Sequence, residues 1–371
     1  MWYIAGIESI GQSDRAAMAV AALITSDTFV IVDESTYIKG HKAKRTQRII
    51  DYSRGCRYRL ILTGTPMTQG IPDLFSQLYF LSPKILGYKS WHSFAANHLE
   101  YDPDRPGLLR RTHNTEYLAA KMRPYVYQVT KRDCLTLPAK LYKDCRCDLT
   151  TAQERAYQLA KDDFFERVEA EGGEVSSYAV FKLFTALQSI VCGFWTREGE
   201  RLTYPHRRLD TLLEVIRQVP ADAKIIIWAK YRNAVEEIAA ALGDEAVRFY
   251  GGASHVERET ALERFRDSAR FLVATQASGS HGLTLNEAHY VIFYAQGYKY
   301  AERIQSEDRC HRIGQTEPVT YISIWSDTKI EERIASAIAR KGDALKQFRE
   351  EIDKIKREGI KEKVRELVNA L

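Results

Sequence analysis

The sequence predicts an α/β protein in which mostly parallel sheets, covered by helices, form two lobes with a helical connection. Short, continuous apolar runs bounded by polar residues are typical of strands buried on both faces, and they occur at 29–32, 60–62, 225–228, 271–274, 291–294 and 321–325. In the second half of the chain, amphipathic segments of helical length separate these runs. The middle of the chain has helical periodicity and no such run.

The elements follow in a regular order. Strands 29–32 and 60–62 each lead into a polar motif, and helices are predicted at 150–171 and 176–192, on either side of a glycine-containing break. The second lobe then alternates strands and helices: strand 225–228, helix 233–242, strand 247–250, helix 256–265 and strand 271–274. We expect βαβ units and a parallel sheet there.

The chain of 371 residues is long enough for two or three domains. From 328 onward it is charge-rich and helical, which favours a solvated amphipathic helix on the last sheet over a partner-binding tail. The predicted division is a first lobe at 1–140, a helical bridge at 141–205, a second lobe at 206–327 and a C-terminal helical extension at 328–371.

Composition excludes several classes of protein. Hydrophobic residues make up 45% and charged residues 28%, unlike a disordered chain. The net charge of +5 is too small to establish nucleic-acid binding by itself. Six cysteines without a Cys-x-x-Cys pair argue against a zinc ribbon or a disulfide framework and favour reduced thiols in a cytoplasmic protein. We find no membrane-spanning stretch and no secretory signal.

Two polar motifs follow the strands of the first lobe. Asp33 and Glu34 stand where the carboxyl end of a parallel strand would place them in a ligand-binding crevice. There Asp33 could hold Mg²⁺ through water, and Glu34 could polarise a water that attacks a γ-phosphate. The run Thr63-Gly64-Thr65-Pro66 delivers small polar residues that can sense a phosphate or a nucleic-acid backbone. Ordinary turns at the ends of strands are the alternative for both motifs.

The most specific motif is Gln305-Ser-Glu-Asp-Arg309-Cys-His-Arg312-Ile-Gly-Gln315. Arg309 and Arg312 are three residues apart, which predicts that they share one helical face and reach one anionic ligand. Surface ion pairs with Glu307 and Asp308 are the alternative. That alternative does not explain the closing Ile-Gly-Gln.

The order of these motifs resembles the Swi/Snf family of superfamily-two helicase-like ATPases, which are double-stranded-DNA translocases. Lesser matches to the family occur in the same order at 131–138, 224–230, 250–254 and 275–285. The resemblance extends over roughly residues 7–325. A collinear set of this kind is far more specific than any one of its members.

The resemblance implies two RecA-like lobes with an ATP site between them, and double-stranded DNA as the partner. Asp33 and Glu34 would be the Walker B pair, with Mg²⁺ on Asp33, while Arg309 and Arg312 would be arginine fingers. The other implied roles are Gln305 as a polar partner of the fingers, Gly282 and Thr284 near the nucleotide, Thr63 and Thr65 in coupling to DNA, and Thr275, Ser254 and Lys230 at DNA phosphates. Lys42 and Arg45 belong to a basic run that permits a DNA-facing role, with a solvated helical face as the alternative.

One expected part of such an ATPase is missing. The chain has no Gly-Lys dipeptide, hence no Gly-x-x-x-x-Gly-Lys-Ser/Thr phosphate loop, and only 32 residues precede Asp33. We therefore expect an incomplete first lobe, with the P-loop on a separate chain or a missing N-terminal segment, and little or no ATP hydrolysis by this chain alone. A non-catalytic DNA-binding or partner-binding module is the alternative. A nuclease using Asp33, Glu34 and His41 is disfavoured, because no further metal-ligand cluster supports it.

Overall fold

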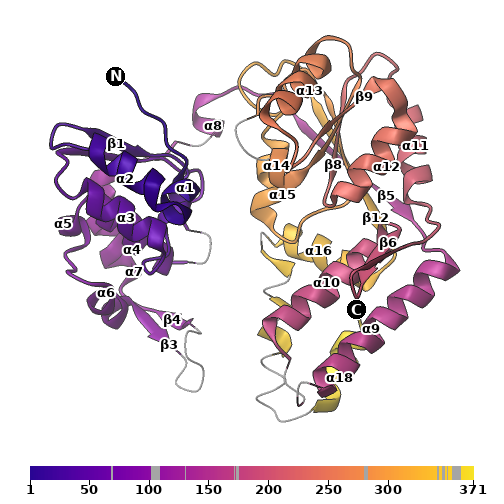
Figure 1. The fold of residues 1–371 in the computed structure, drawn as a ribbon, viewed down its shortest axis with the longest axis horizontal. Helices are drawn as coiled ribbons and strands as arrows, with labels where there is room; N and C mark the ends of the chain where they lie inside the picture. Colours follow the sequence, from indigo (N-terminus) through magenta and orange to yellow (C-terminus); the bar gives the residue numbers. More distant parts are fainter. Residues whose placement is uncertain are drawn as a thin grey trace. The chain divides into compact units, whose positions relative to one another are not determined.

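The structure of the chain is a computed structural model. The structure describes residues 1–67, 70–101, 109–129, 131–170, 172, 175–279, 283–340, 342–344, 347–348, 350–352 and 361–371. The chain forms two compact units, Met1–Asp133 and Cys134–Leu371, called here the first unit and the second unit (Figure 1).

The first unit is mostly helical around a small parallel sheet. Strand β1 (Phe29–Val32) pairs in parallel with β2 (Tyr58–Ile61), and η1 (Ser35–Ile38) follows β1. Its other elements are α1 (Ile7–Gln12), α2 (Asp14–Leu23), α3 (Lys44–Ser53), α4 (Pro72–Leu81), α5 (Pro83–Leu86), α6 (Trp91–His98), β3 (Leu99–Tyr101), β4 (Leu109–Thr112), α7 (Thr115–Met122), η2 (Arg123–Tyr125) and α8 (Lys131–Cys134), which crosses the boundary between the units.

The sheet of the first unit differs from the prediction. Both predicted strands form, but their residues are not buried on both faces, and β2 alternates exposed and half-buried side chains. Val32 reaches the core, where it packs with Ile38 of η1 and Phe80 of α4. Over the described residues these two strands pair with no further strand, so the expectation of fully buried strands is wrong here.

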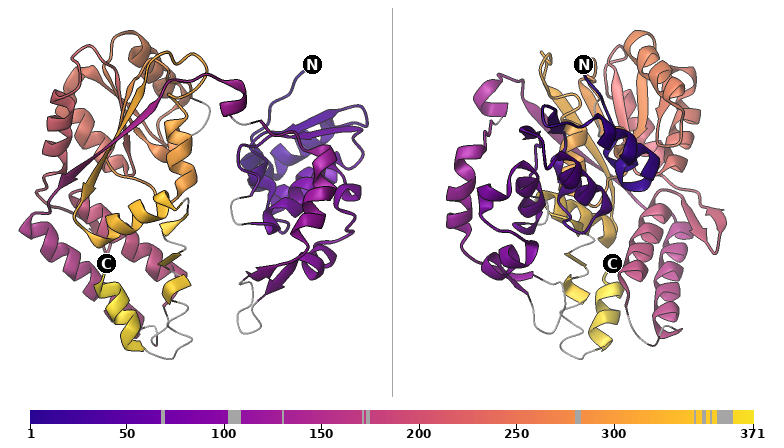
Figure 2. Two further views of the ribbon diagram at one scale, coloured as in Figure 1. Left: turned by 180° about the vertical axis from the view of Figure 1, so that it is seen from behind. Right: turned by 60° about the vertical axis from the view of Figure 1, so that its left-hand side comes forward.

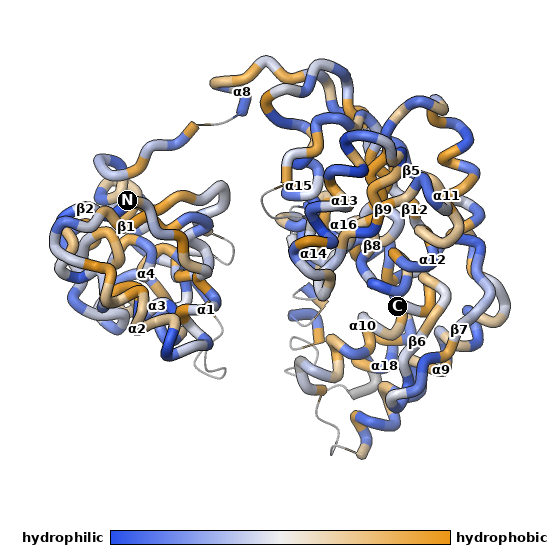
Figure 3. Tube along the Cα trace, turned by 45° about the horizontal axis from the view of Figure 1, so that its top comes forward, coloured by the Kyte–Doolittle hydropathy of each residue, from blue (hydrophilic) through white to orange (hydrophobic). Residues whose placement is uncertain are grey.

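The second unit contains a six-stranded parallel sheet, which confirms the predicted α/β class. Its strand order is β5-β12-β11-β8-β10-β9, and every pairing is parallel. The strands are β5 (Lys140–Cys147), β8 (Ile225–Ala229), β9 (Ala246–Phe249), β10 (Phe271–Thr275), β11 (Tyr290–Phe293) and β12 (Val319–Ser326). Hydrophobic residues fill the central strand β8 (Figure 3), whereas the edge strand β5 is mostly polar and exposed.

Helices cover both faces of this sheet. Ile225 and Ile227 of β8 pack with α11 (Arg208–Arg217) and α12 (Arg232–Leu242) on one face. The alternate residues Ile226 and Trp228 pack with α13 (His255–Asp267) on the other face. This alternation is the period-two pattern of a strand buried on both sides, as the sequence predicted for 225–228.

The two helices predicted in the middle of the chain form α9 (Thr151–Ala170) and α10 (Ser177–Val191), which pack against each other (Figure 2). They share a hydrophobic core with α16 (Lys329–Ala339) and with residues of α18 (Lys361–Asn369). The tract predicted as one helix from 328 therefore contains at least two helices, α16 and α18. Some of the residues between them are not described. A short hairpin, β6 (Phe194–Arg197) and β7 (Glu200–Thr203), follows α10.

The remaining elements lie around the sheet of the second unit. They are η3 (Gly243–Glu245), α14 (Gln276–Gly279) and α15 (Tyr300–Glu307). Four of the six cysteines are buried, namely Cys56, Cys147, Cys192 and Cys310. Over the described residues, no helix has the length and apolar character needed to cross a membrane.

Candidate functional site

The acidic pair lies immediately after β1, at the carboxyl end of the small parallel sheet. Asp33 is exposed and Glu34 is half-buried. Glu34 has left-handed backbone angles, φ 47° and ψ 54°, which residues other than glycine, asparagine and aspartate rarely adopt and which are concentrated at functional sites. The Glu34 amide donates to Asp33 Oδ1 at 2.8 Å, so the two residues form one tight turn, the carboxylate turn.

A buried glutamine joins this turn to the second polar motif of the first unit. Ser35 Oγ donates to Gln77 Oε1 at 2.6 Å, and Gln77 Nε2 donates to the Pro66 carbonyl at 2.8 Å. Ser35 is fully buried and Gln77 is 1% exposed. Gln77 on α4 therefore fixes the carboxylate turn and the Thr-Gly-Thr-Pro segment relative to each other. Gln77 was not among the predicted site residues, because it lies in an apolar helix outside the motifs.

The two threonines expected to couple to DNA follow β2. Thr63 is half-buried and Thr65 is exposed. The Thr65 amide donates to Thr63 Oγ1 at 3.1 Å, a local turn stabilised by a hydroxyl. The structure thus brings Thr63 and Thr65 to the same sheet edge as Asp33 and Glu34, through the parallel pairing of β1 and β2.

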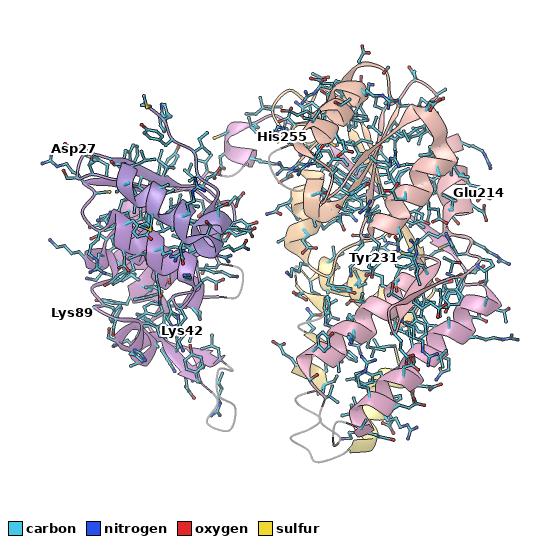
Figure 4. The ribbon with its side chains drawn as sticks, in the orientation of Figure 1. Asp27, Lys42, Lys89, Glu214, Tyr231 and His255 are labelled. Atoms are coloured by element: carbon cyan, nitrogen blue, oxygen red, sulfur yellow. The ribbon has the colours of Figure 1, made fainter. Side chains whose placement is uncertain are left out.

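The basic run is partly committed to contacts within the first unit. Arg45 Nε donates to the Tyr37 carbonyl at 2.7 Å, and Arg48 NH1 donates to the Ile10 carbonyl at 2.8 Å. Asp14 pairs with both Arg48 and Lys44, and hydrogen bonds from these two residues hold the pKa of Asp14 below its usual value. Lys42 is exposed and labelled in Figure 4. Of the two predicted DNA contacts, Lys42 faces solvent and Arg45 is anchored to the fold.

In the second unit, Arg309 and Arg312 converge on one carbonyl. Arg309 NH1 donates to Leu283 O at 3.2 Å, and Arg312 NH1 donates to the same oxygen at 3.1 Å. The prediction that they share a helical face is wrong, because α15 ends at Glu307 and both arginines lie in the turn 308–314, called here the arginine turn. The two arginines meet instead through the fold of this turn, in which both bind the Leu283 carbonyl. Arg309 Nε also donates to the carbonyl of Gln305, the predicted polar partner.

The segment next to the arginine turn contains the residues expected near the nucleotide. Thr284 is exposed and follows Leu283, while the Leu285 amide donates to the Arg309 carbonyl at 3.0 Å. Thr284 is therefore held beside the arginines by contacts of both its chain neighbours. Gly282, the other predicted nucleotide contact, lies outside the described residues.

The closing Ile-Gly-Gln of the motif has a structural explanation. Gly314 has φ 97°, and a Cβ there would lie 2.6 Å from Asn286 Nδ2, so only glycine fits. Gln315 is 5% exposed, and its Nε2 lies 3.3 Å from the carbonyls of Asn286, Ala288 and Cys310. These two residues close the arginine turn onto the segment that contains Thr284.

The three predicted phosphate contacts of the second unit have different environments. Ser254 is exposed and caps α13, where its Oγ accepts the Glu257 amide at 3.2 Å. Thr275 at the end of β10 is buried, with its hydroxyl bonded to that of Ser278. Lys230 is half-buried, and its ammonium group binds a side chain of the same unit.

Lys230 lies just after β8 and binds α10. Its Nζ donates to Gln188 Oε1 at 2.6 Å and lies 3.0 Å from the centroid of the Tyr298 ring. Burial holds the pKa of Lys230 well below its usual value. Tyr231, labelled in Figure 4, donates to the Thr185 carbonyl of the same helix at 3.3 Å. Helix α10 thus fixes the carboxyl end of β8.

Two family models match the chain. One described as SNF2-related domain matches residues 3–193, and one described as Helicase conserved C-terminal domain matches residues 207–314. The chain is also similar to a solved structure, the Sulfolobus solfataricus SWI2/SNF2 ATPase core in complex with dsDNA, with 25% identity, a TM-score of 0.46, and coverage of 87% of this chain and 70% of that one.

Curated relatives extend well beyond the matched region. An uncharacterized ATP-dependent helicase of Mycoplasma pneumoniae is 24% identical over 332 residues, covering 87% of this chain and 31% of that protein. The SWI/SNF chromatin-remodeling complex subunit snf22 of Schizosaccharomyces pombe is 27% identical over 350 residues, covering 85% and 20% respectively. The chain spans about a third or less of the length of these relatives. Because the SNF2-related model matches more than half of the chain, the protein belongs to the Snf2 family of helicase-like ATPases.

Proposed function

We propose that this chain forms the part of a DNA-dependent ATPase that carries its acidic pair and its arginine fingers, and that the complete enzyme translocates on double-stranded DNA. The observation that carries the proposal is the convergence of Arg309 and Arg312 on the Leu283 carbonyl. Two guanidinium groups held at one point are suited to the several oxygens of a transferred phosphoryl group.

In this mechanism one ATP binds to groups from both units. The half-buried carboxylate of Glu34 orients the attacking water and withdraws its proton, while Arg309 and Arg312 stabilise the negative charge that develops on the phosphoryl oxygens. Gln305 belongs to the same motif as the arginines, and Thr284 is exposed beside them. Thr63 and Thr65 would connect the nucleotide state to DNA, because Gln77 links their segment to the carboxylate turn.

Asp33 has the chemistry needed for Mg²⁺. Its carboxylate is exposed, and among the described residues only the Glu34 amide donates to it, at Oδ1. Oδ2 is left for a hard cation or for a water bound to one. Bound Mg²⁺ would neutralise charge on the phosphates. Lys42 and Ser254 are exposed and suit contacts with the DNA backbone, whereas Arg45, Thr275 and Lys230 make contacts inside their own units.

We further propose that the phosphate loop belongs to additional polypeptide, either a separate chain or an N-terminal segment of a longer one. The sequence given has no Gly-Lys dipeptide. The two-stranded sheet leaves apolar side chains exposed: Phe29 by 51%, Tyr58 by 56%, Leu60 by 38% and Leu62 by 46%. Parallel sheets are almost always covered on both faces, so further strands and helices fit this surface. We also propose the division into a first lobe at 1–140, a helical bridge at 141–205, a second lobe at 206–327 and a C-terminal extension at 328–371.

The test is ATP hydrolysis with and without a polypeptide that carries the P-loop. We expect no DNA-stimulated turnover by the chain alone, turnover when the P-loop polypeptide is added, and loss of that turnover in Glu34→Gln. Asp27→Asn, an exposed carboxylate on the same unit, is the matched control and should remain active. Turnover by the chain alone that Glu34→Gln abolishes would contradict the need for a partner. DNA binding with no turnover under any condition would favour the non-catalytic module.

A further inference from the structure

Glu307, the last residue of α15, has an unusually demanding environment for a carboxylate. Its side chain is 3% exposed. Its Oε1 accepts Arg303 Nε at 2.8 Å, and its Oε2 accepts Lys140 Nζ and Tyr142 OH, each at 2.9 Å. A buried carboxylate is stable only when it is paired and hydrogen-bonded in this way, so the position of Glu307 depends on these donors.

Two of these donors come from a distant part of the sequence. Lys140 and Tyr142 lie on β5, and Lys140 Nζ also lies 3.4 Å from Asp308 Oδ1. Residues 134–140, called here the joining segment, begin at the boundary between the two units and end at Lys140, the first residue of β5. The joining segment is therefore attached by charge to the residues that begin the arginine turn.

A second contact holds the turn farther along. His311 Nε2 donates to the Pro138 carbonyl of the joining segment at 2.8 Å. His311 lies between Arg309 and Arg312, so a contact at its ring acts on the backbone that carries both guanidinium groups. The amides of Cys310 and His311 each donate to the Glu307 carbonyl at 3.2 Å, which makes Glu307 the base of the turn.

Tyr142 and Arg303 strengthen the same arrangement. Burial, followed by the Glu307 carboxylate, raises the pKa of Tyr142, so its hydroxyl stays a donor. Arg303 also donates to Gln296 Oε1 at 2.8 Å and to Ser323 Oγ at 3.0 Å, and its guanidinium lies 3.5 Å from the centroid of the Phe293 ring. Arg303 thus fixes Glu307 to β12 and to the end of β11, while Lys140 fixes it to the joining segment.

We propose that Glu307 and Lys140 are positioning residues for the arginine turn and that they connect its geometry to the joining segment. A displacement of residues 134–140 then moves the backbone of the turn, because both Lys140 and Pro138 are bound to it. The catalytic part of this role rests on the proposed function, in which Arg309 and Arg312 act on ATP. The structural part does not depend on that function.

The structural part is tested on the chain alone by hydrogen exchange over residues 308–315. Tyr142→Phe removes one hydroxyl, and Lys140→Met removes the charge while keeping the length of the side chain. We expect exchange in the turn to be about tenfold faster in Lys140→Met, with a smaller increase in Tyr142→Phe. Lys143→Met is the matched control, because Lys143 also lies on β5 but binds Gln218 at 3.0 Å. Unchanged exchange in Lys140→Met and Tyr142→Phe would overturn the proposal.

The catalytic part is tested by ATP hydrolysis after a P-loop polypeptide is added. We expect Lys140→Met to lower kcat with little change in KM for ATP, and Lys140→Arg to restore most of the loss by restoring the charge. A kcat equal to that of the unmodified chain in Lys140→Met would overturn the positioning role. Absence of hydrolysis by the unmodified chain in the presence of the P-loop polypeptide would instead refute the proposed function, and the exchange result would still decide the structural part.

Discussion

Replacing Gln77 by leucine should destabilise the carboxylate turn by an amount that can be worked from its contacts. The substitution keeps the size of the side chain but removes the acceptor of Ser35 Oγ and the donor to the Pro66 carbonyl. Each such bond contributes about 1 kcal/mol, and a fully buried hydroxyl left without an acceptor costs ~1–3 kcal/mol. We expect Gln77→Leu to lower the free energy of local opening by about 2–4 kcal/mol.

Native-state hydrogen exchange is the suitable assay, because a chain of two units need not unfold in a single transition. The Ser35 amide, which donates to the Leu62 carbonyl at 3.0 Å, is the probe. Gln47→Leu on α3, at an exposed position, is the control and should leave this amide unchanged.

A double substitution separates the hydrogen bond from other effects of Gln77→Leu. In the variant that combines Ser35→Ala with Gln77→Leu, the hydroxyl and the amide that bond to each other are both removed. The decrease in the free energy of local opening should therefore be smaller, by at least ~1 kcal/mol, than the sum of the decreases in the two single variants. Losses that add to within ~0.5 kcal/mol would refute the network.

Three further predictions concern stability. Glu34→Gly should raise the free energy of unfolding of the first unit by up to ~1 kcal/mol in a denaturant titration, since glycine accepts the left-handed backbone; a decrease would contradict this. Arg208→Met should lower the free energy of unfolding of the second unit by ~3–5 kcal/mol, because it leaves the Glu331 carboxylate buried without its cation. Adding Glu331→Met should recover most of that stability in thermal unfolding, and a double variant no more stable than Arg208→Met would contradict the prediction. Burial, and after it the charge of Lys42, holds the pKa of His41 below 6.5. The unfolded chain therefore binds a proton at His41 more readily, and the free energy of unfolding should fall as the pH drops below 6.5. His41→Asn should reduce this dependence of stability on pH, and an unchanged dependence would contradict the prediction.

The elements that could be predicted from the sequence are those whose buried residues form a clear hydrophobic pattern along the chain. Strand β8 is the clear example, since all five of its residues are buried and its flanking helices have matching apolar faces. Strand β5 was missed because its residues are polar and mostly exposed. It belongs to the sheet through eight backbone pairs with β12, and such pairing leaves no local pattern in the sequence.

The residues of the candidate site that belong to sequence motifs could be predicted, and those outside the motifs could not. Asp33 and Arg309 were found from motif order, whereas Gln77 and Lys140 act through side-chain contacts between segments distant in sequence. The two arginines do meet, at the Leu283 carbonyl, but the predicted helical face is wrong, because α15 ends at Glu307 and contacts with Leu283 and Leu285 hold the turn that follows. Spacing along a chain places two residues on one helical face only where the helix continues past both of them.

In the proposed function, the arginine turn completes an ATP site when the P-loop is supplied. The most direct measurement is DNA-stimulated ATP hydrolysis by the chain together with a P-loop polypeptide, compared between the unmodified protein and Arg309→Gln. Arg266→Gln, at another half-exposed arginine of the second unit, serves as the control. We predict that Arg309→Gln lowers kcat by about 10³-fold, as expected for loss of an arginine finger, while the control retains its activity. Equal kcat values in the unmodified protein and Arg309→Gln would contradict the claim.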